Sequence, residues 1–413
     1  MTIESQPVVL GLLAVILGLV FTTEASPNPR LKKFYAIVPS ILLCYFIPGL
    51  LNTFGIIDGS DKTLYVMARD YLLPLALVLL CLACDLRSIL RLGPKAVILF
   101  FTGTFGVIVG APIALWIMGQ FDPSLWSDQG PESVWRGMST TAGSWIGGGA
   151  NQAAMQATYD VGPNIFGKFA AVDVIVANVW MAFLLFLAAR SAHLDTLRGA
   201  DTRALVDLGA RVAKVQLETA RHTRTVDLIQ ILAIGLGATG FAHWLTALIV
   251  PAIRQHAPHL ERYSLTASFL WITVIATVIG LALSFTRAKR LEGAGASRVG
   301  SAAIYLLVAT IGMQMDLRSI FTDFELFAIG AIWISIHGAL MLLVAWLIRA
   351  PVFYMAVGSM ANIGGAASAP VVASAFNPAL APVGVLLAVL GYAVGTLGGW
   401  FTGILLQAVV AAG

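Results

Sequence analysis

Apolar stretches of membrane-spanning length follow one another along almost the whole chain. A helix that crosses a bilayer needs about 20 predominantly apolar residues. The candidate segments are 7–22, 34–50, 64–84, 96–118, 134–158, 164–189, 226–250, 264–285, 299–315, 324–348, 351–376 and 379–409. Together they account for nearly all of the 413 residues. The pattern therefore predicts an all-α polytopic membrane protein with no room for a soluble catalytic domain.

Composition supports this class of protein. Only 11% of the residues are charged, whereas a soluble domain carries about 25%. The first apolar segment follows Glu4 and no basic residue, so we expect a retained helix rather than a cleaved signal peptide. Cys81 and Cys84 lie inside an apolar run, which favours a packing role over a metal or redox site. The net charge of +4 comes from residues at helix ends, so no nucleic-acid partner is expected.

Two of the apolar segments are broken by glycine clusters, at 144–152 (SWIGGGANQ) and at 361–368 (ANIGGAAS). Glycine clusters form helices poorly. Paired, interrupted apolar segments at matching places in two halves of a chain are typical of the substrate site of a secondary transporter. Close packing between membrane helices is the alternative interpretation, because small residues also favour it.

The two halves of the chain repeat one another. The tetrapeptide at 85–88 (DLRS) recurs at 316–319, and Ile146 and Ile363 begin Ile-Gly-Gly motifs that lie 217 residues apart. The order of helix, DLRS, helix and Ile-Gly-Gly is the same in both halves. We therefore expect a first repeat over 1–189 and a second over 226–413. The stretch 190–225 between them is expected to contain an amphipathic cytoplasmic helix.

The distribution of Lys and Arg favours two re-entrant hairpins, at about 133–163 and 350–378. With both segments re-entrant, about ten helices cross, and 18 of the 25 basic residues lie on one side. If both segments cross fully, the better orientation divides these residues 15 to 10. Basic loops face the cytoplasm. The favoured arrangement makes the repeats inverted, places both termini outside and brings both glycine tips to the bilayer midplane.

The tips supply the candidate substrate site. A hairpin tip at membrane depth exposes backbone N–H groups at the start of its second helix, which favour an anionic group such as a carboxylate. Neighbouring side chains add hydrogen-bond donors and acceptors. The candidate substrate-binding residues are Ser144, Gly147, Gly148, Gly149, Asn151, Gln152, Ser359, Asn362, Gly364, Gly365 and Ser368.

Asp173 is the clearest ionisable residue inside a span, with Asn178 five residues further on. Intramembrane acids are costly and often belong to ion or proton routes, so both residues are candidates for ion coupling. A satisfied structural acid is the alternative, and Leu390 occupies the matching position in the second repeat. His337 is a weaker case and is interpreted as a packed hydrogen-bond donor.

The glycine motifs at 144–151 and 362–366, together with the duplicated DLRS, resemble the YjcL-like membrane family of bacteria and plants, a domain of unknown function, over essentially the whole chain. By its hairpin glycines the chain is more distantly similar to the sodium–glutamate and sodium–citrate (2-hydroxycarboxylate) symporters. Those relatives imply an inverted-repeat, elevator-type dimer whose glycine tips hold substrate and cations. Ala366-Ala367 stands where a glycine is expected, so the substrate cannot be transferred from them.

We therefore expect a secondary active transporter in the inner membrane. It would move a small anionic or zwitterionic solute, such as an organic acid, an amino acid or a short peptide, with a Na⁺ or H⁺ gradient. A channel is the second hypothesis, and a membrane-embedded enzyme is the third because no catalytic or metal motif is present. No cofactor is expected apart from a bound Na⁺. Substrate identity, the coupling ion and the direction of transport are left open.

Overall fold

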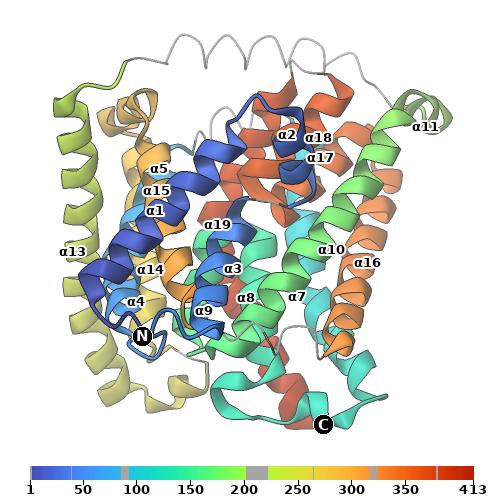
Figure 1. The fold of residues 1–413 in the computed structure, drawn as a ribbon. Coiled ribbons are helices and arrows are strands. Elements are labelled where there is room, and N and C mark those ends of the chain that lie inside the picture. The colour runs from blue at the N-terminus through green and yellow to red at the C-terminus, as the bar shows by residue number, and fades with distance from the viewer. Residues whose placement is uncertain are drawn as a thin grey trace.

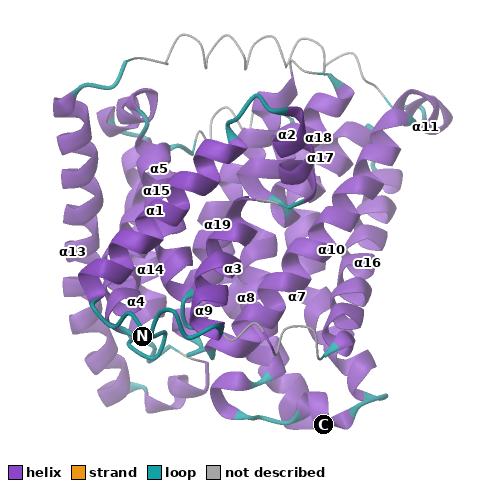
Figure 2. Cartoon of the chain, viewed as in Figure 1, coloured by secondary structure: helices purple, strands orange, loops and turns teal. Residues whose placement is uncertain are grey.

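The structure is a computed structural model of the chain, and it describes residues 2–38, 40–84, 93–200, 222–263, 265–315, 318, 323–377 and 380–413. Within these ranges nearly all of the backbone is helical, and no strand occurs beyond an isolated bridge between Ile3 and Ile57 (Figure 2). The predicted all-helical membrane fold is confirmed. The tetrapeptide 85–88, most of 316–319 and the centre of the linker (201–221) lie outside the described residues.

The helices follow one another with short connections. Their bounds are α1 (Gln6–Glu24), α2 (Pro29–Ile37), α3 (Ser40–Thr53), α4 (Thr63–Met67), η1 (Ala68–Leu72), α5 (Leu73–Leu82), α7 (Pro94–Gly119), η2 (Pro123–Trp126), η3 (Gly130–Glu132), α8 (Val134–Gly147), α9 (Gly149–Thr158), α10 (Pro163–Ala189), α11 (Ser191–Arg198), α13 (Thr225–His256), η4 (Pro258–Tyr263), α14 (Ser268–Ser284), η5 (Arg287–Ala294), α15 (Ala296–Gly312), α16 (Phe324–Leu347), α17 (Val352–Ile363), α18 (Gly365–Phe376) and α19 (Ala381–Ala412).

Seven of the described helical segments are long and apolar enough to cross a membrane. The long spans are α1, α4–α5, α7, α10, α13, α16 and α19. An eighth is possible where α14 bends by 96° into η5. The helices α3 and α15 are shorter, at 14 and 17 residues. A helix satisfies its own backbone hydrogen bonds, which lipid cannot do. The predicted number of about ten crossing helices stays a prediction.

The described helices pack in two groups, which lie side by side in Figure 1. In the first, which we call the hairpin group, α7 packs on α16 and α17, α8 packs on α19, and α10 contacts α8, α16, α17 and α18. In the second, the flanking group, α5 packs on α13, α14 and α15, and α3 packs on α1 and α15. The two groups meet where α14 and α5 contact α9 and α19.

Candidate functional site

The segment that follows the first glycine cluster folds back on the segment before it, as hairpin 1 (α8 and α9). A Cβ placed on Gly143 would lie 2.5 Å from Asn151 O and 2.9 Å from Met155 Cγ. At the base, Arg136 donates to Tyr159 O, and the Trp135 and Tyr159 rings lie 5.4 Å apart. In a straight helix, residues 12 apart would be separated by about 18 Å, so these contacts require a hairpin.

Local chemistry explains where hairpin 1 turns and how it is anchored. Gly148 adopts a φ of +77°, a left-handed conformation that glycine tolerates far better than other residues. At the base, Ser133 Oγ donates to Asp128 Oδ1 over 2.6 Å. This hydrogen bond lowers the pKa of the Asp128 carboxyl, which therefore stays charged at neutral pH.

Hairpin 2 (α17 and α18) has the same construction. Helix α17 ends at Ile363, and Gly365, with a φ of +59°, begins α18. The rings of Phe353 and Phe376, at the two ends of the hairpin, lie 5.4 Å apart. Figure 1 shows α17 and α18 in the half of the bundle that holds α11, and α8 and α9 in the half that holds the two termini. The hairpins therefore enter the bundle from opposite ends.

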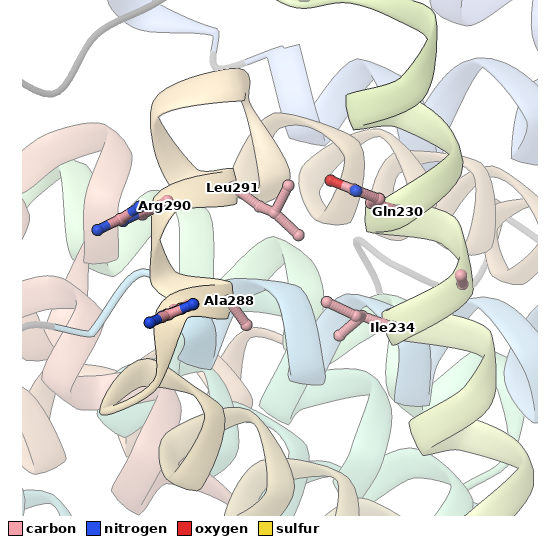
Figure 3. A pocket seen from close by; sticks show the side chains of 7 residues that line it. Gln230, Ile234, Ala288, Arg290 and Leu291 are labelled. Atoms are coloured by element: carbon pink, nitrogen blue, oxygen red, sulfur yellow. The ribbon is translucent and has the colours of Figure 1, made fainter.

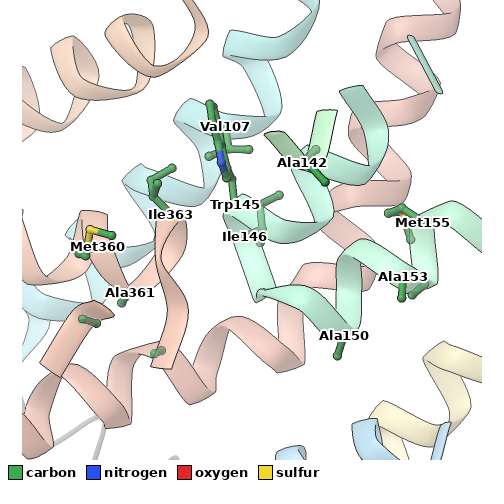
Figure 4. Close-up of a cluster of buried hydrophobic side chains, with 14 of the residues drawn as sticks. Val107, Ala142, Trp145, Ile146, Ala150, Ala153, Met155, Met360, Ala361 and Ile363 are labelled. Carbon is green, nitrogen blue, oxygen red and sulfur yellow. The ribbon is translucent and has the colours of Figure 1, made fainter. Parts of the chain in front are cut away.

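The two glycine tips meet inside the bundle. A Cβ placed on Gly365 would lie 4.0 Å from Gly148 Cα, and one on Gly148 would lie 3.5 Å from Tyr392 Cε1 of α19. Figure 4 shows Ile363 of hairpin 2 on the side of Trp145 and Val107, close to hairpin 1. The N-terminal ends of α9 and α18 consequently converge, and each carries backbone N–H groups and a partial positive charge. Gly148, Gly149, Gly364, Gly365 and Ser368 are half-buried, whereas Gly147 is buried.

The two asparagines of the tips are fully buried and bonded to protein. Asn151 accepts from Thr396 Oγ1 (2.6 Å) and donates to Gly147 O (2.8 Å). Asn362 accepts from Thr104 Oγ1 (2.8 Å) and donates to Phe100 O and Gly358 O. These side chains hold the tips on α19 and α7. Sequence reasoning did not select the two threonines, although polar residues inside apolar spans were the available signal.

Asp173 joins α10 to hairpin 1. Its carboxylate accepts from Ser144 Oγ (2.6 Å), from Trp145 Nε1 (2.7 Å) and from Gln152 Nε2 (3.4 Å). The predicted residues Ser144, Gln152 and Asp173 are therefore brought together. Asn178 instead donates to Val174 O of its own helix. Hydrogen bonds donated to a carboxylate favour its charged form, whereas burial opposes that form; the side chains of all three donors are themselves buried.

Ser359 belongs to a second buried network, in hairpin 2. Its hydroxyl oxygen accepts from Trp180 Nε1 and lies 2.8 Å from His337 Nε2, while His337 Nδ1 lies 3.0 Å from Gly103 O. If His337 donates through Nδ1, its Nε2 accepts from Ser359, and every bond is satisfied by a neutral imidazole. This network links α7, α10, α16 and hairpin 2. It agrees with the interpretation of His337 as a packed donor.

Other features of the described residues lie apart from the tips. A groove between α13 and η5, with a volume of about 490 Å³, is lined by Gln230, Ile234, Ala288 and Leu291 among others (Figure 3). It belongs to the flanking group. Within the described part of the chain, no cluster of three or more His, Cys, Asp or Glu side chains could hold a metal ion. An alkali cation at the tips would depend on backbone carbonyl, hydroxyl and amide oxygens.

The chain is similar to a family of proteins of unknown function. Residues 11–409 match the family described as "Protein of unknown function (DUF819)". The chain belongs to this family. It is also similar to the uncharacterized membrane protein YjcL of Bacillus subtilis (strain 168), with 24% identity over 355 residues, covering 84% of this chain and 85% of that protein. The resemblance to a YjcL-like family of unknown function is therefore confirmed, and the protein is an integral membrane protein.

Proposed function

We propose that this protein is a secondary active transporter that moves a small, carboxylate-bearing solute with a Na⁺ or H⁺ gradient. The observation that carries the proposal is the meeting of two helical hairpins, from opposite ends of the bundle, at Gly148 and Gly365. Two helix N-termini directed at one point attract an anionic group without a basic side chain. Half-buried glycines let a ligand approach the backbone.

The packing supports an elevator mechanism, in which the hairpin group moves as one body against the flanking group. Within the hairpin group, buried hydrogen bonds join separate elements, as in Asn151–Thr396, Asn362–Thr104 and Trp333–Val107. Such bonds resist separation of the elements because a buried polar group that loses its partner is costly. We also propose the homodimer that the resemblance to the symporters implies, together with the inner-membrane location and the cytoplasmic placement of the 190–225 linker.

Asp173 is the proposed coupling residue. Moving a charge into or out of a site inside a membrane is expensive, and acids there commonly exchange a proton or help to hold a cation. Asp173 touches the tip through Ser144 and Gln152. A change in the charge of Asp173 would therefore change the electrostatic potential and the hydrogen bonding at the tip.

The substrate class can be tested by a stability screen of the purified protein against organic acids, amino acids and short peptides. A ligand at 100 times its dissociation constant adds about 2.7 kcal/mol to the free energy of unfolding. For a solute that raises the unfolding temperature, uptake into proteoliposomes is then measured with and without an imposed Na⁺ or H⁺ gradient. We expect saturable accumulation that stops when the gradient is collapsed. Gradient-independent, non-saturating flux would indicate a channel, and conversion of the solute would indicate an enzyme.

The role of Asp173 is tested in the same proteoliposomes. Asp173→Asn keeps the shape of the side chain and removes its charge, so solute exchange at equilibrium should persist while gradient-driven accumulation is lost. Asp122→Asn, in the loop after α7, is the matched control and should behave like the wild type. Full accumulation by Asp173→Asn would contradict the coupling role.

A further inference from the structure

Tyr45 is a buried residue of the flanking group that reaches the candidate site. It lies on α3, and its backbone packs tightly on α15, since a Cβ on Gly312 would lie 2.3 Å from Tyr45 O. Its side chain is 3% exposed and lies against Phe166, with ring centroids 5.7 Å apart. Its hydroxyl is 3.2 Å from Gln152 Oε1 on hairpin 1.

The direction of this hydrogen bond follows from Asp173. A carboxylate only accepts, so Gln152 must turn its amide nitrogen towards Asp173 and its oxygen towards Tyr45. Tyr45 is then the donor. A hydrogen-bonded chain runs from the flanking group, through Tyr45 and Gln152, to the buried carboxylate. If the hairpin group moves against the flanking group, the Tyr45–Gln152 bond must break.

A second acceptor lies one turn along the same helix. Gln156 is four residues after Gln152 on α9, so the two side chains project from the same face. Gln156 is 5% exposed, and its Oε1 has no hydrogen-bond partner in the described structure. A buried acceptor without a partner destabilises the state in which it occurs. An orphaned oxygen at this position is therefore ready to receive a donor from the flanking group.

We propose that Tyr45 is a positioning residue whose hydroxyl holds Gln152 in this state and Gln156 after the hairpin group has moved by one helical turn. One turn of α9 is about 5.4 Å, and one-turn displacements of packed elements are a known form of two-state transition. Because α9 runs from the tip towards the end that holds the termini, the step carries the hairpin group towards the end that holds α11. The inference rests on the proposed elevator mechanism.

The test measures the position of the hairpin group without a substrate. Spin labels replace Phe121, after α7, and Phe285, after α14, in the full chain with its three cysteines changed to alanine. These residues are 81% and 60% exposed; Phe121 follows α7 of the hairpin group and Phe285 follows α14 of the flanking group, and these two helices finish at opposite ends of the bundle (Figure 1). Pulsed electron–electron double resonance in lipid nanodiscs then measures the distance between the labels. This distance shortens when the hairpin group moves by the proposed helical turn.

Gln152→Leu removes the acceptor of the present state. We therefore expect the population at the shorter distance, relative to that at the longer distance, to rise about fivefold, as the loss of one hydrogen bond predicts. Adding Gln156→Leu should reverse that rise. In a Tyr45→Phe background neither leucine should change the ratio. Tyr35→Phe is the matched control, since its hydroxyl bonds Thr23 Oγ1 and Val20 O inside the flanking group.

The role of Tyr45 would be overturned if both distances occur but Gln156→Leu does not change their population ratio, or changes it equally in the Tyr45→Phe background. Either result would not contradict the elevator mechanism. A single unchanged distance in every variant would instead reject movement of the hairpin group, and with it the proposed mechanism. The Tyr35→Phe control must match the wild type for the effect to be assigned to the Tyr45 hydroxyl.

Discussion

At the scale of single residues, the two tip asparagines show what sequence can and cannot predict. The glycine clusters beside Asn151 and Asn362 predicted that both residues lie at hairpin tips, because clustered glycines form helices poorly and interrupt an apolar segment. Their hydrogen bonds are to Thr396 and Thr104, which lie 245 and 258 residues away. No local pattern contains such pairs. The sequence predicts that both amides bind substrate, which stays a prediction; in this structure each amide bonds a neighbouring helix and anchors its tip.

The anchoring role predicts an energetic coupling between Asn151 and Thr396. Asn151→Ala and Thr396→Val should each lower the unfolding temperature of the purified protein. The double variant should lose less stability than the sum of the two single losses. The coupling should be about 0.5–3 kcal/mol, as for other contacting pairs. Thr402→Val, which removes a bond to Gly398 O of the same helix, is the matched control. Additive losses of stability for Asn151→Ala and Thr396→Val would show that the two side chains have no coupling free energy.

At the scale of elements, α19 supplies a glycine surface on which hairpin 1 lies. A Cβ on Gly391 would lie 2.6 Å from Ile146 O, one on Gly395 would lie 2.6 Å from Asn151 Cγ, and one on Gly399 would lie 2.8 Å from Met155 Cγ. The four-residue spacing of these glycines is typical of close helix packing. The identity of the partner came only from the structure, because spacing describes one surface and not what covers it.

This packing predicts that even one methyl group disturbs the site. Gly395→Ala should displace hairpin 1 and lower the free energy of unfolding by about 1–3 kcal/mol, the usual cost of overpacking. Gly240→Ala on α13 is the control, because a Cβ there meets nothing within 4 Å. It should be neutral or slightly stabilising, since alanine favours helix more than glycine does. Thermal unfolding in detergent measures both, and equal stability of the two variants would contradict the packing argument.

At the scale of the whole molecule, apolar segment length predicted the helical membrane fold correctly. The same rule predicts spans at 34–50 and 299–315, where the structure has α3 and α15, helices of only 14 and 17 residues. The bend of 96° between α14 and η5 falls where the apolar segment 264–285 ends, but the sequence did not predict its angle. The inverted repeats, the elevator mechanism and the number of spans stay predictions.

Labelling of the two ends of each hairpin tests the central claim most directly. Single cysteines at Asp128 and Asp160 flank hairpin 1, and single cysteines at Arg349 and Asn377 flank hairpin 2; each is introduced into the chain with its native cysteines removed. A membrane-impermeant maleimide is applied to intact cells and then to opened membranes. We predict that Asp128→Cys and Asp160→Cys both react from outside, and that Arg349→Cys and Asn377→Cys react only after opening. Labelling of the two ends of one hairpin from opposite sides would mean that it crosses the membrane, and would contradict the account.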